Sequence, residues 1–230
     1  MRKNFLTLTL LLFFGVCLFA QPRAASEPRM LVQTSDEPLQ RPVWSADGNT
    51  LFLNNGYQIS SDGTNYRRST TPAATLRRQA AAVNPLLQQM IDEPVRVVSQ
   101  VAGLSSLAGH MVFNPVLSPT GDRIVFEADM GKGLFVMNAD GTGLRSLGTG
   151  ISNATWTADG RYLVVMRTED DGRVITKGDL MSVDVATGAR NLFFASDRFI
   201  TFNPVISPDG RRLVFEDYAT RVIYIMDIQQ

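Results

Sequence analysis

The chain has 230 residues, of which 44% are apolar and 19% charged, and its 22 basic and 22 acidic side chains give a formal charge of zero at pH 7. This is the composition of a globular protein rather than of a disordered one. The neutral balance removes the electrostatic attraction on which sequence-independent nucleic-acid binding depends, so we expect no nucleic-acid partner. The single cysteine, Cys17, leaves no disulfide framework.

The N-terminus has the layout of a secretory signal peptide. Two basic residues precede an uncharged apolar run from Phe5 to Ala20, which is shorter than the roughly 20 apolar residues that span a bilayer. We expect cleavage after Ala20, with an uncleaved anchor as the alternative. The sequence therefore predicts a periplasmic or secreted protein without stable membrane insertion, divided into a signal peptide at 1–20, a linker at 21–28 and one domain at 29–230.

Four segments then share one pattern. In each, a short apolar strand leads into a turn that ends in Gly, and a second strand rich in β-branched and aromatic residues follows. The four turns are Ser45–Gly48, Ser118–Gly121, Thr157–Gly160 and Ser207–Gly210. Each segment predicts a β-hairpin in which the Gly has a positive φ.

A second hairpin follows in several of these units. Gly56–Thr64 matches Gly133–Thr142, and Leu180–Gly188 is a looser third copy. Two hairpins per unit give four antiparallel strands in about 40 residues, which is the size of a propeller blade. Strands such as Ile124–Phe126 are apolar on both faces, so neighbouring blades must cover each sheet on both sides.

The repeats also carry a family resemblance. The box Ser207–Gly210 and the run Met137–Gly141 resemble the repeats of TolB-like, WD-type β-propellers, over most of residues 37–228. The resemblance implies an extracytoplasmic interaction module, although some members are fused to hydrolase domains. TolB itself has an additional N-terminal domain that these repeats do not match, so the resemblance does not identify a partner.

The segment from Thr70 to His110 lacks a repeat box. Pro72–Ala82 predicts a helix with Pro near its first turn. However, Asn84-Pro85 echoes the Asn-Pro that opens other repeats, and Pro94–Val101 is strand-like, so a degenerate blade is expected here. We therefore expect five blades. Four blades with a helical insertion are the alternative, and an open array that completes itself by dimerising is a further one.

The two ends of the repeat array predict how the ring closes. The last repeat stops after a third strand, and Met30–Thr34 is an apolar segment ahead of the first repeat. We expect this segment to pair with Val222–Met226 and supply the missing fourth strand. Closure of this kind removes an exposed sheet edge.

Catalytic hypotheses are limited by the inventory of reactive groups. His110 is the only histidine, so a multi-histidine metal site is excluded and no metal or cofactor is expected. Glu127 and Glu216 occupy the same strand end in two units, and paired carboxylates are typical of acid–base chemistry. A hydrolase or lyase that uses Glu127, Glu216 or His110 in the channel is thus the alternative to a non-catalytic protein.

Two groups of residues suggest binding. The first is the position before the innermost strand of each unit, where side chains converge on one mouth of a propeller channel: Arg41, Asn84, Asn114, Asn153 and Asn203. A ring of amides can hydrogen-bond a peptide chain, because each Asn offers both a donor and an acceptor. The alternative is that each Asn caps its own local turn.

The second group is a basic run. Residues 63–91 contain no acidic side chain and carry four arginines, Arg67, Arg68, Arg77 and Arg78. The run predicts either a solvated helix face or a docking surface for an acidic protein or headgroup. Taken together, the sequence predicts an exported, non-catalytic β-propeller that binds a protein or peptide.

Overall fold

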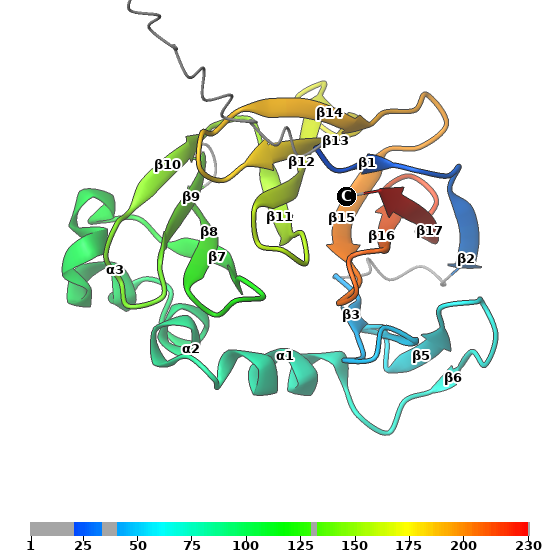
Figure 1. The fold of residues 1–230 in the computed structure, drawn as a ribbon, viewed down its shortest axis with the longest axis horizontal. Coiled ribbons are helices and arrows are strands. Elements are labelled where there is room, and N and C mark those ends of the chain that lie inside the picture. Colours follow the sequence, from blue (N-terminus) through cyan, green and yellow to red (C-terminus); the bar gives the residue numbers. More distant parts are fainter. Residues whose placement is uncertain (1–20, 34–40, 130–132, 230) are drawn as a thin grey trace, which may run out of the picture.

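The structure is a computed structural model that describes residues 21–33, 41–129 and 133–229. Their strands form four antiparallel sheets, which Figure 1 shows arranged around a common centre. We call these sheets blades 1 to 4 in chain order. The arrangement confirms the all-β propeller class that the repeats predicted. The predicted signal peptide lies outside the described residues.

The first three blades are four-stranded meanders whose strands follow one another in the chain. Blade 1 consists of β3 Val43–Trp44, β4 Thr50–Phe52, β5 Tyr57–Ser60 and β6 Arg67–Arg68. Blade 2 consists of β7 Val112–Leu117, β8 Arg123–Ala128, β9 Gly133–Asn138 and β10 Arg145–Gly148. Blade 3 consists of β11 Ser152–Trp156, β12 Tyr162–Asp170, β13 Ile175–Asp184 and β14 Arg190–Phe194.

Blade 4 combines the two ends of the chain. Its consecutive strands are β15 Thr201–Ile206, β16 Arg212–Asp217 and β17 Val222–Gln229. β2 Arg29–Gln33 pairs antiparallel with the first half of β17, with Met30 opposite Tyr224, as predicted. β1 Arg23–Ala24, within the predicted linker, pairs with the far end of β17. The N-terminal segment therefore supplies the outer strand of the last blade.

Helices occupy the stretch of the ring between blade 1 and blade 2 (Figure 1). They are α1 Ala73–Ala81, α2 Pro85–Asp92, α3 Arg96–Gln100 and the 3₁₀ helix η1 Ala102–Leu107. Their apolar side chains, among them Leu87, Met90 and Val97, pack against blade 2 around Phe126. The helical segment thus covers the face of blade 2 that a further blade would otherwise cover.

The expectation of a strand at Pro94–Val101 is wrong. Residues 96–100 form α3, which buries Val97 and Val98 against blade 2. The five-blade expectation is not confirmed, because the described residues contain four sheets and a helical segment. They correspond instead to the alternative of four blades with a helical insertion.

The second strand of each repeat is buried from both sides, as its two apolar faces predicted. Ile124, Val125 and Phe126 on β8 are fully buried. Ile124 and Phe126 belong to the cluster with the helices, whereas Val125 belongs to the cluster with blade 3. Neighbouring layers therefore cover the two faces of blade 2, which is what holds a propeller ring together.

Two features shape the repeated turns: a Gly at positive φ, and a Ser or Thr whose hydroxyl donates a hydrogen bond to an Asp. Gly121, Gly160 and Gly210 have φ values of +75°, +67° and +69°, as predicted. In the last of these turns, Ser207 Oγ donates to Asp209 Oδ1 at 2.5 Å, and the same oxygen accepts from the backbone N–H of Arg211 at 3.1 Å. The Ser207 hydroxyl, more than any other contact, holds the pKa of Asp209 below its usual range. These carboxylates therefore stabilise turns.

Replacing Gly210 by Val should lower the free energy of unfolding by about 2 kcal/mol, because a β-branched residue is strained at positive φ. Chemical denaturation of the purified variant measures this change. Asn at the same position tolerates the left-handed conformation, so Gly210→Asn is the matched control and should lose less. A Val variant as stable as the original chain would contradict the assigned turn geometry.

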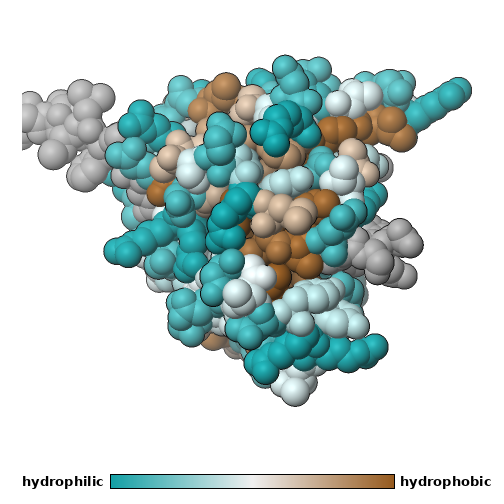
Figure 2. Space-filling view, turned by 90° about the vertical axis from the view of Figure 1, so that its right-hand side faces the viewer, coloured by the Kyte–Doolittle hydropathy of each residue, from teal (hydrophilic) through white to brown (hydrophobic). Residues whose placement is uncertain are grey.

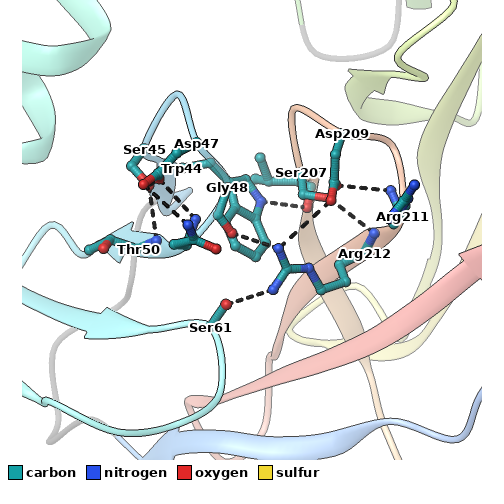
Figure 3. Close-up of polar contacts among 12 residues, drawn as sticks. Trp44, Ser45, Asp47, Gly48, Thr50, Ser61, Ser207, Asp209, Arg211 and Arg212 are labelled. Atoms are coloured by element: carbon teal, nitrogen blue, oxygen red, sulfur yellow. Dashed lines mark hydrogen bonds and ion pairs between the residues drawn. The ribbon is translucent and has the colours of Figure 1, made fainter.

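Blade 4 meets blade 1 through a side-chain contact that Figure 3 shows in close-up. The indole Nε1 of Trp44 donates to the carbonyl of Val205 at 3.3 Å, and the Arg212 guanidinium lies 5.3 Å from the centre of the indole ring. Arg212 Nη2 also donates to the carbonyl of Gly48 at 2.7 Å, and its Nη1 donates to Ser61 Oγ at 2.5 Å. We call this contact the seam latch.

The same latch joins blade 2 to blade 3. Trp156 Nε1 donates to the carbonyl of Val116 at 3.0 Å, and Arg123 Cζ lies 5.4 Å from the centre of the Trp156 ring. Arg123 Nη2 donates to the carbonyl of Gly160 at 2.9 Å. The interface between blades 4 and 1, where the two ends of the ring meet, is thus stabilised by the same kind of contact as the interface between blades 2 and 3.

Candidate functional site

Three of the predicted mouth residues share one backbone conformation. Asn114, Asn153 and Asn203 have φ values of +48°, +50° and +50°. Each lies where the pairing between the first and second strands of its blade shifts register. Asn is among the few residue types that adopt the left-handed region readily. Their repetition therefore has a local backbone cause, a bulge in the innermost strand.

Side chains from the second strands connect these asparagines. Asn114 Nδ2 donates to Glu127 Oε1 at 3.0 Å and to Asn153 Oδ1 at 3.1 Å. The backbone N–H of Asn153 donates to the same Glu127 oxygen at 2.9 Å. Met166, the counterpart of Glu127 in blade 3, accepts from Asn153 Nδ2 at 3.5 Å and from the N–H of Asn203 at 3.3 Å. The three asparagines therefore belong to one network across three blades.

Arg41 joins this network from blade 1. Its Nη2 donates to the carbonyl of Ala154, next to Asn153, and Arg77 Nη2 on α1 donates to the carbonyl of Arg41. Burial lowers the pKa of Arg41 to about 10, while the charge of Glu127 raises it and that of Arg77 lowers it. Arg41 therefore carries its positive charge at neutral pH. We call the set Arg41, Asn114, Glu127, Asn153 and Asn203 the channel mouth.

Asn84 does not belong to the channel mouth. Its Oδ1 accepts from the N–H of Leu87 at 2.8 Å, which makes it the N-cap of α2, and its Nδ2 donates to the carbonyl of Ala139 at 3.1 Å. Ala139 lies at the end of blade 2 that carries the repeat turn, where its backbone N–H donates to the carbonyl of Asp122. The expected position of Asn84 is therefore wrong, because Asn-Pro opens a helix here.

The predicted basic run is divided between two places. Arg67 and Arg68 are exposed on β6, the outer strand of blade 1, and Arg78 is exposed on α1. Arg77 turns inward to Arg41, and burial lowers its pKa. Only Arg67 and Arg68 therefore form an adjacent pair of exposed charges.

The residues of the enzymatic alternative have separate partners. His110 Nδ1 lies 2.5 Å from Asp129 Oδ2, and Arg221 Nη1 lies 3.3 Å from Glu216 Oε1. Glu127 is held by Asn114 and Asn153 in the channel mouth. Within the described residues, no three His, Cys, Asp or Glu side chains are grouped to hold a metal ion. No helix in that part of the chain is long and apolar enough to cross a membrane.

The sequence analysis missed two features of these surfaces. The first is Met166, because nothing in the repeat pattern predicts that its sulfur accepts hydrogen bonds from two blades. Tyr57 and Tyr66 stack with ring centres 4.9 Å apart beside the exposed Arg68. The signal for this stack was available, since both tyrosines belong to one hairpin and lie on the same face.

The conformation at Asn114 gives a direct test of the mouth geometry. Asn114→Ala should be about 1 kcal/mol less stable than Asn114→Gly, because both remove the amide but only Ala is strained at a φ of +48°. Thermal or chemical unfolding of the two variants side by side measures this difference. Equal stabilities would mean that the residue does not hold the left-handed conformation.

Comparison with known proteins gives no family-model match and no match to a curated protein sequence. Solved structures do match. One described as a TolB from Agrobacterium tumefaciens is 20% identical with a TM-score of 0.41, over 86% of this chain and 60% of that one. TolB from Acinetobacter baumannii is 16% identical with a TM-score of 0.38, over 84% of this chain and 44% of that one.

A third similar structure is an oligogalacturonate lyase from Vibrio parahaemolyticus, 12% identical with a TM-score of 0.41, over 82% of this chain and 48% of that one. This chain spans less than two thirds of each of these proteins. The matches include TolB and other β-propeller proteins, the class that the repeats resemble. Enzymes also occur among the matches, as the oligogalacturonate lyase shows.

Proposed function

We propose that the protein acts outside the cytoplasm as a non-catalytic binding module and recognises an extended segment of a partner protein at its channel mouth. Export is supported by the basic residues and short apolar run within residues 1–20. Recognition is supported by the polar groups that three blades and the Arg41 side chain bring to one place. The proposal concerns this chain and not the longer proteins whose structures it matches.

The observation that carries the proposal is the network around Glu127. It fixes the Asn114 amide, which is exposed, while Asn153 is half-buried and Asn203 buried. The three asparagines lie in strands, and Arg41 lies two residues before β3 with its side chain bonded to the carbonyl of Ala154, so their positions are set before a partner binds. The exposed Asn114 amide suits hydrogen bonding to a peptide backbone, and the half-buried Arg41 helps to hold the mouth together through the carbonyl of Ala154.

The enzymatic alternative receives no comparable support. Glu127 accepts two hydrogen bonds within the mouth, Glu216 is paired with Arg221, and His110 is paired with Asp129. Each candidate group is thus engaged with a different partner. The binding module is therefore the function that the geometry favours.

Affinity capture with mouth variants tests the proposal. The purified protein is immobilised and exposed to a cell-envelope extract from the source organism, and retained proteins are identified by mass spectrometry. Asn114→Gly and Arg41→Gln should each lose the retained partner, whereas Asn84→Ser, which preserves the cap of α2, should keep it. Retention of the same proteins by all variants would place the binding elsewhere and contradict the proposal.

A further inference from the structure

The outer rim between blade 4 and blade 1 carries a second exposed surface, far out on the blades from the first strands that form the channel mouth. Figure 2 views the molecule from this side and shows an apolar patch framed by hydrophilic residues. Val32 on β2 and Tyr57 on β5 are half-buried here, and they pack against a cluster that includes Leu31 and Ile59. The rim therefore has an apolar floor that is open to solvent.

A stack of rings borders this floor. Tyr57 and Tyr66 lie nearly parallel, with ring centres 4.9 Å apart and an angle of 12° between the planes. Tyr66 is 44% exposed. The preceding residue, Asn65, has a φ of +57° and donates through Nδ2 to Ser60 Oγ at 3.1 Å. This local conformation fixes the course of the chain into Tyr66, so an exposed ring is presented in a defined place.

Positive charge lies beside the rings. Arg68 Cζ is 5.5 Å from the centre of the Tyr57 ring. Arg67 is also exposed on this short strand, but it pairs with Gln58 and therefore lies on the opposite face. Residues 63–91 contain no acidic side chain. The nearest preceding acid, Asp62, accepts from the N–H of Thr64 at 2.8 Å and from its hydroxyl at 2.7 Å, so its carboxylate is used in its own turn.

We propose that this rim surface, defined as Val32, Tyr57, Tyr66 and Arg68, docks an acidic segment of a partner protein that also carries aromatic side chains. The exposed Arg68 guanidinium complements a carboxylate, and the Tyr66 ring and the apolar floor accept an aromatic side chain. An extended segment with an acidic residue two positions from an aromatic one presents both on one side, which matches a guanidinium and rings that share one face. This docking is independent of the channel mouth.

The test uses a fluorescently labelled peptide of repeating Glu-Ser-Tyr-Ser, which presents Glu and Tyr on the same side of an extended chain, with the full purified protein. Fluorescence anisotropy should detect binding that weakens as salt is raised, because exposed charge pairs are screened. Tyr66→Ala and Arg68→Gln should each weaken binding about fivefold, the effect expected from losing one aromatic or one exposed ionic contact. Both residues are exposed, so both variants should remain folded, with the circular dichroism spectrum of the original chain, although each loses a contact with Tyr57.

Three controls separate this surface from other causes. Arg78→Gln removes an arginine of the same basic run from α1 and should leave binding unchanged. A peptide of repeating Lys-Ser-Tyr-Ser should not bind, and phosphatidylglycerol vesicles should not compete with the acidic peptide. The proposal is overturned if Arg78→Gln weakens binding as much as Arg68→Gln, if the two peptides bind equally, or if only the vesicles bind.

Discussion

Removal of residues 23–33, which contain β1 and β2, is expected to lower the free energy of unfolding by about 4 kcal/mol or more, because the ring loses a strand's hydrogen bonds and a buried leucine. These strands pair with β17 along both of its halves, and Leu31 is 7% exposed in the cluster between blades 4 and 1. Urea denaturation of the truncated protein measures the loss.

The matched reference for this deletion is a chain that lacks only residues 1–20. The truncated protein also exposes the edge of β17, so it should dimerise or aggregate at concentrations where the reference is monodisperse. A synthetic peptide of residues 21–33 added in trans should restore stability. Identical urea midpoints for the deletion and its reference would show that the N-terminal segment does not close the ring.

Trp44→Ala should lower the free energy of unfolding by about 3–5 kcal/mol, the range found for removing a large buried aromatic side chain. The substitution removes the indole ring between blades 4 and 1, the hydrogen bond to Val205, and the surface on which Arg212 lies. Because this interface joins the two ends of the blade array, its loss also opens the ring. Chemical denaturation monitored by circular dichroism measures the change.

Trp44→Phe is the control, since it keeps a ring but loses the indole N–H and should cost about 1 kcal/mol. Trp156→Ala removes the corresponding latch between blades 2 and 3 and should cost a similar amount to Trp44→Ala. A Trp44→Ala variant within about 0.5 kcal/mol of the original chain, the range of ordinary surface substitutions, would contradict the seam latch.

The blades and their closure were predictable because they depend on local patterns that recur. Turns such as Ser207–Gly210 combine Gly at positive φ with an Asp that accepts local hydrogen bonds, and both requirements are visible in the sequence. The pairing of β2 with β17 followed from a last repeat that lacked one strand. In each case local chemistry and the global fold favour the same structure.

The helical segment was less predictable because its signals conflict. The run Val95–Val98 favours a strand by propensity, yet α3 forms there because Val97 and Val98 are buried against blade 2. The dipeptide Asn-Pro also occurs in two different local structures. At Asn114 it opens a bulge in a strand, whereas at Asn84 it gives a helix its N-cap and a Pro at the first helical position.

The channel mouth was predictable in part. The repeat alignment gave Asn114, Asn153 and Asn203 equivalent positions, and the structure gives all three the same left-handed backbone conformation. The bond from Arg41 to the carbonyl of Ala154 was not predictable, since it depends on how far apart blade 1 and blade 3 lie once the ring has closed. Arg41 stands where the other repeats have Asn, so no periodic signal predicts this bond.

The central claim is that the protein binds its partner at the channel mouth, and site-specific photo-crosslinking in living cells tests it most directly. A photo-reactive amino acid is placed at position 114 in the mouth or, in a separate variant, at position 47 in an exposed repeat turn of blade 1. We expect position 114 to form one discrete crosslinked product with a partner protein, and position 47 to form none. Crosslinking to the same protein from position 47 alone would contradict the account.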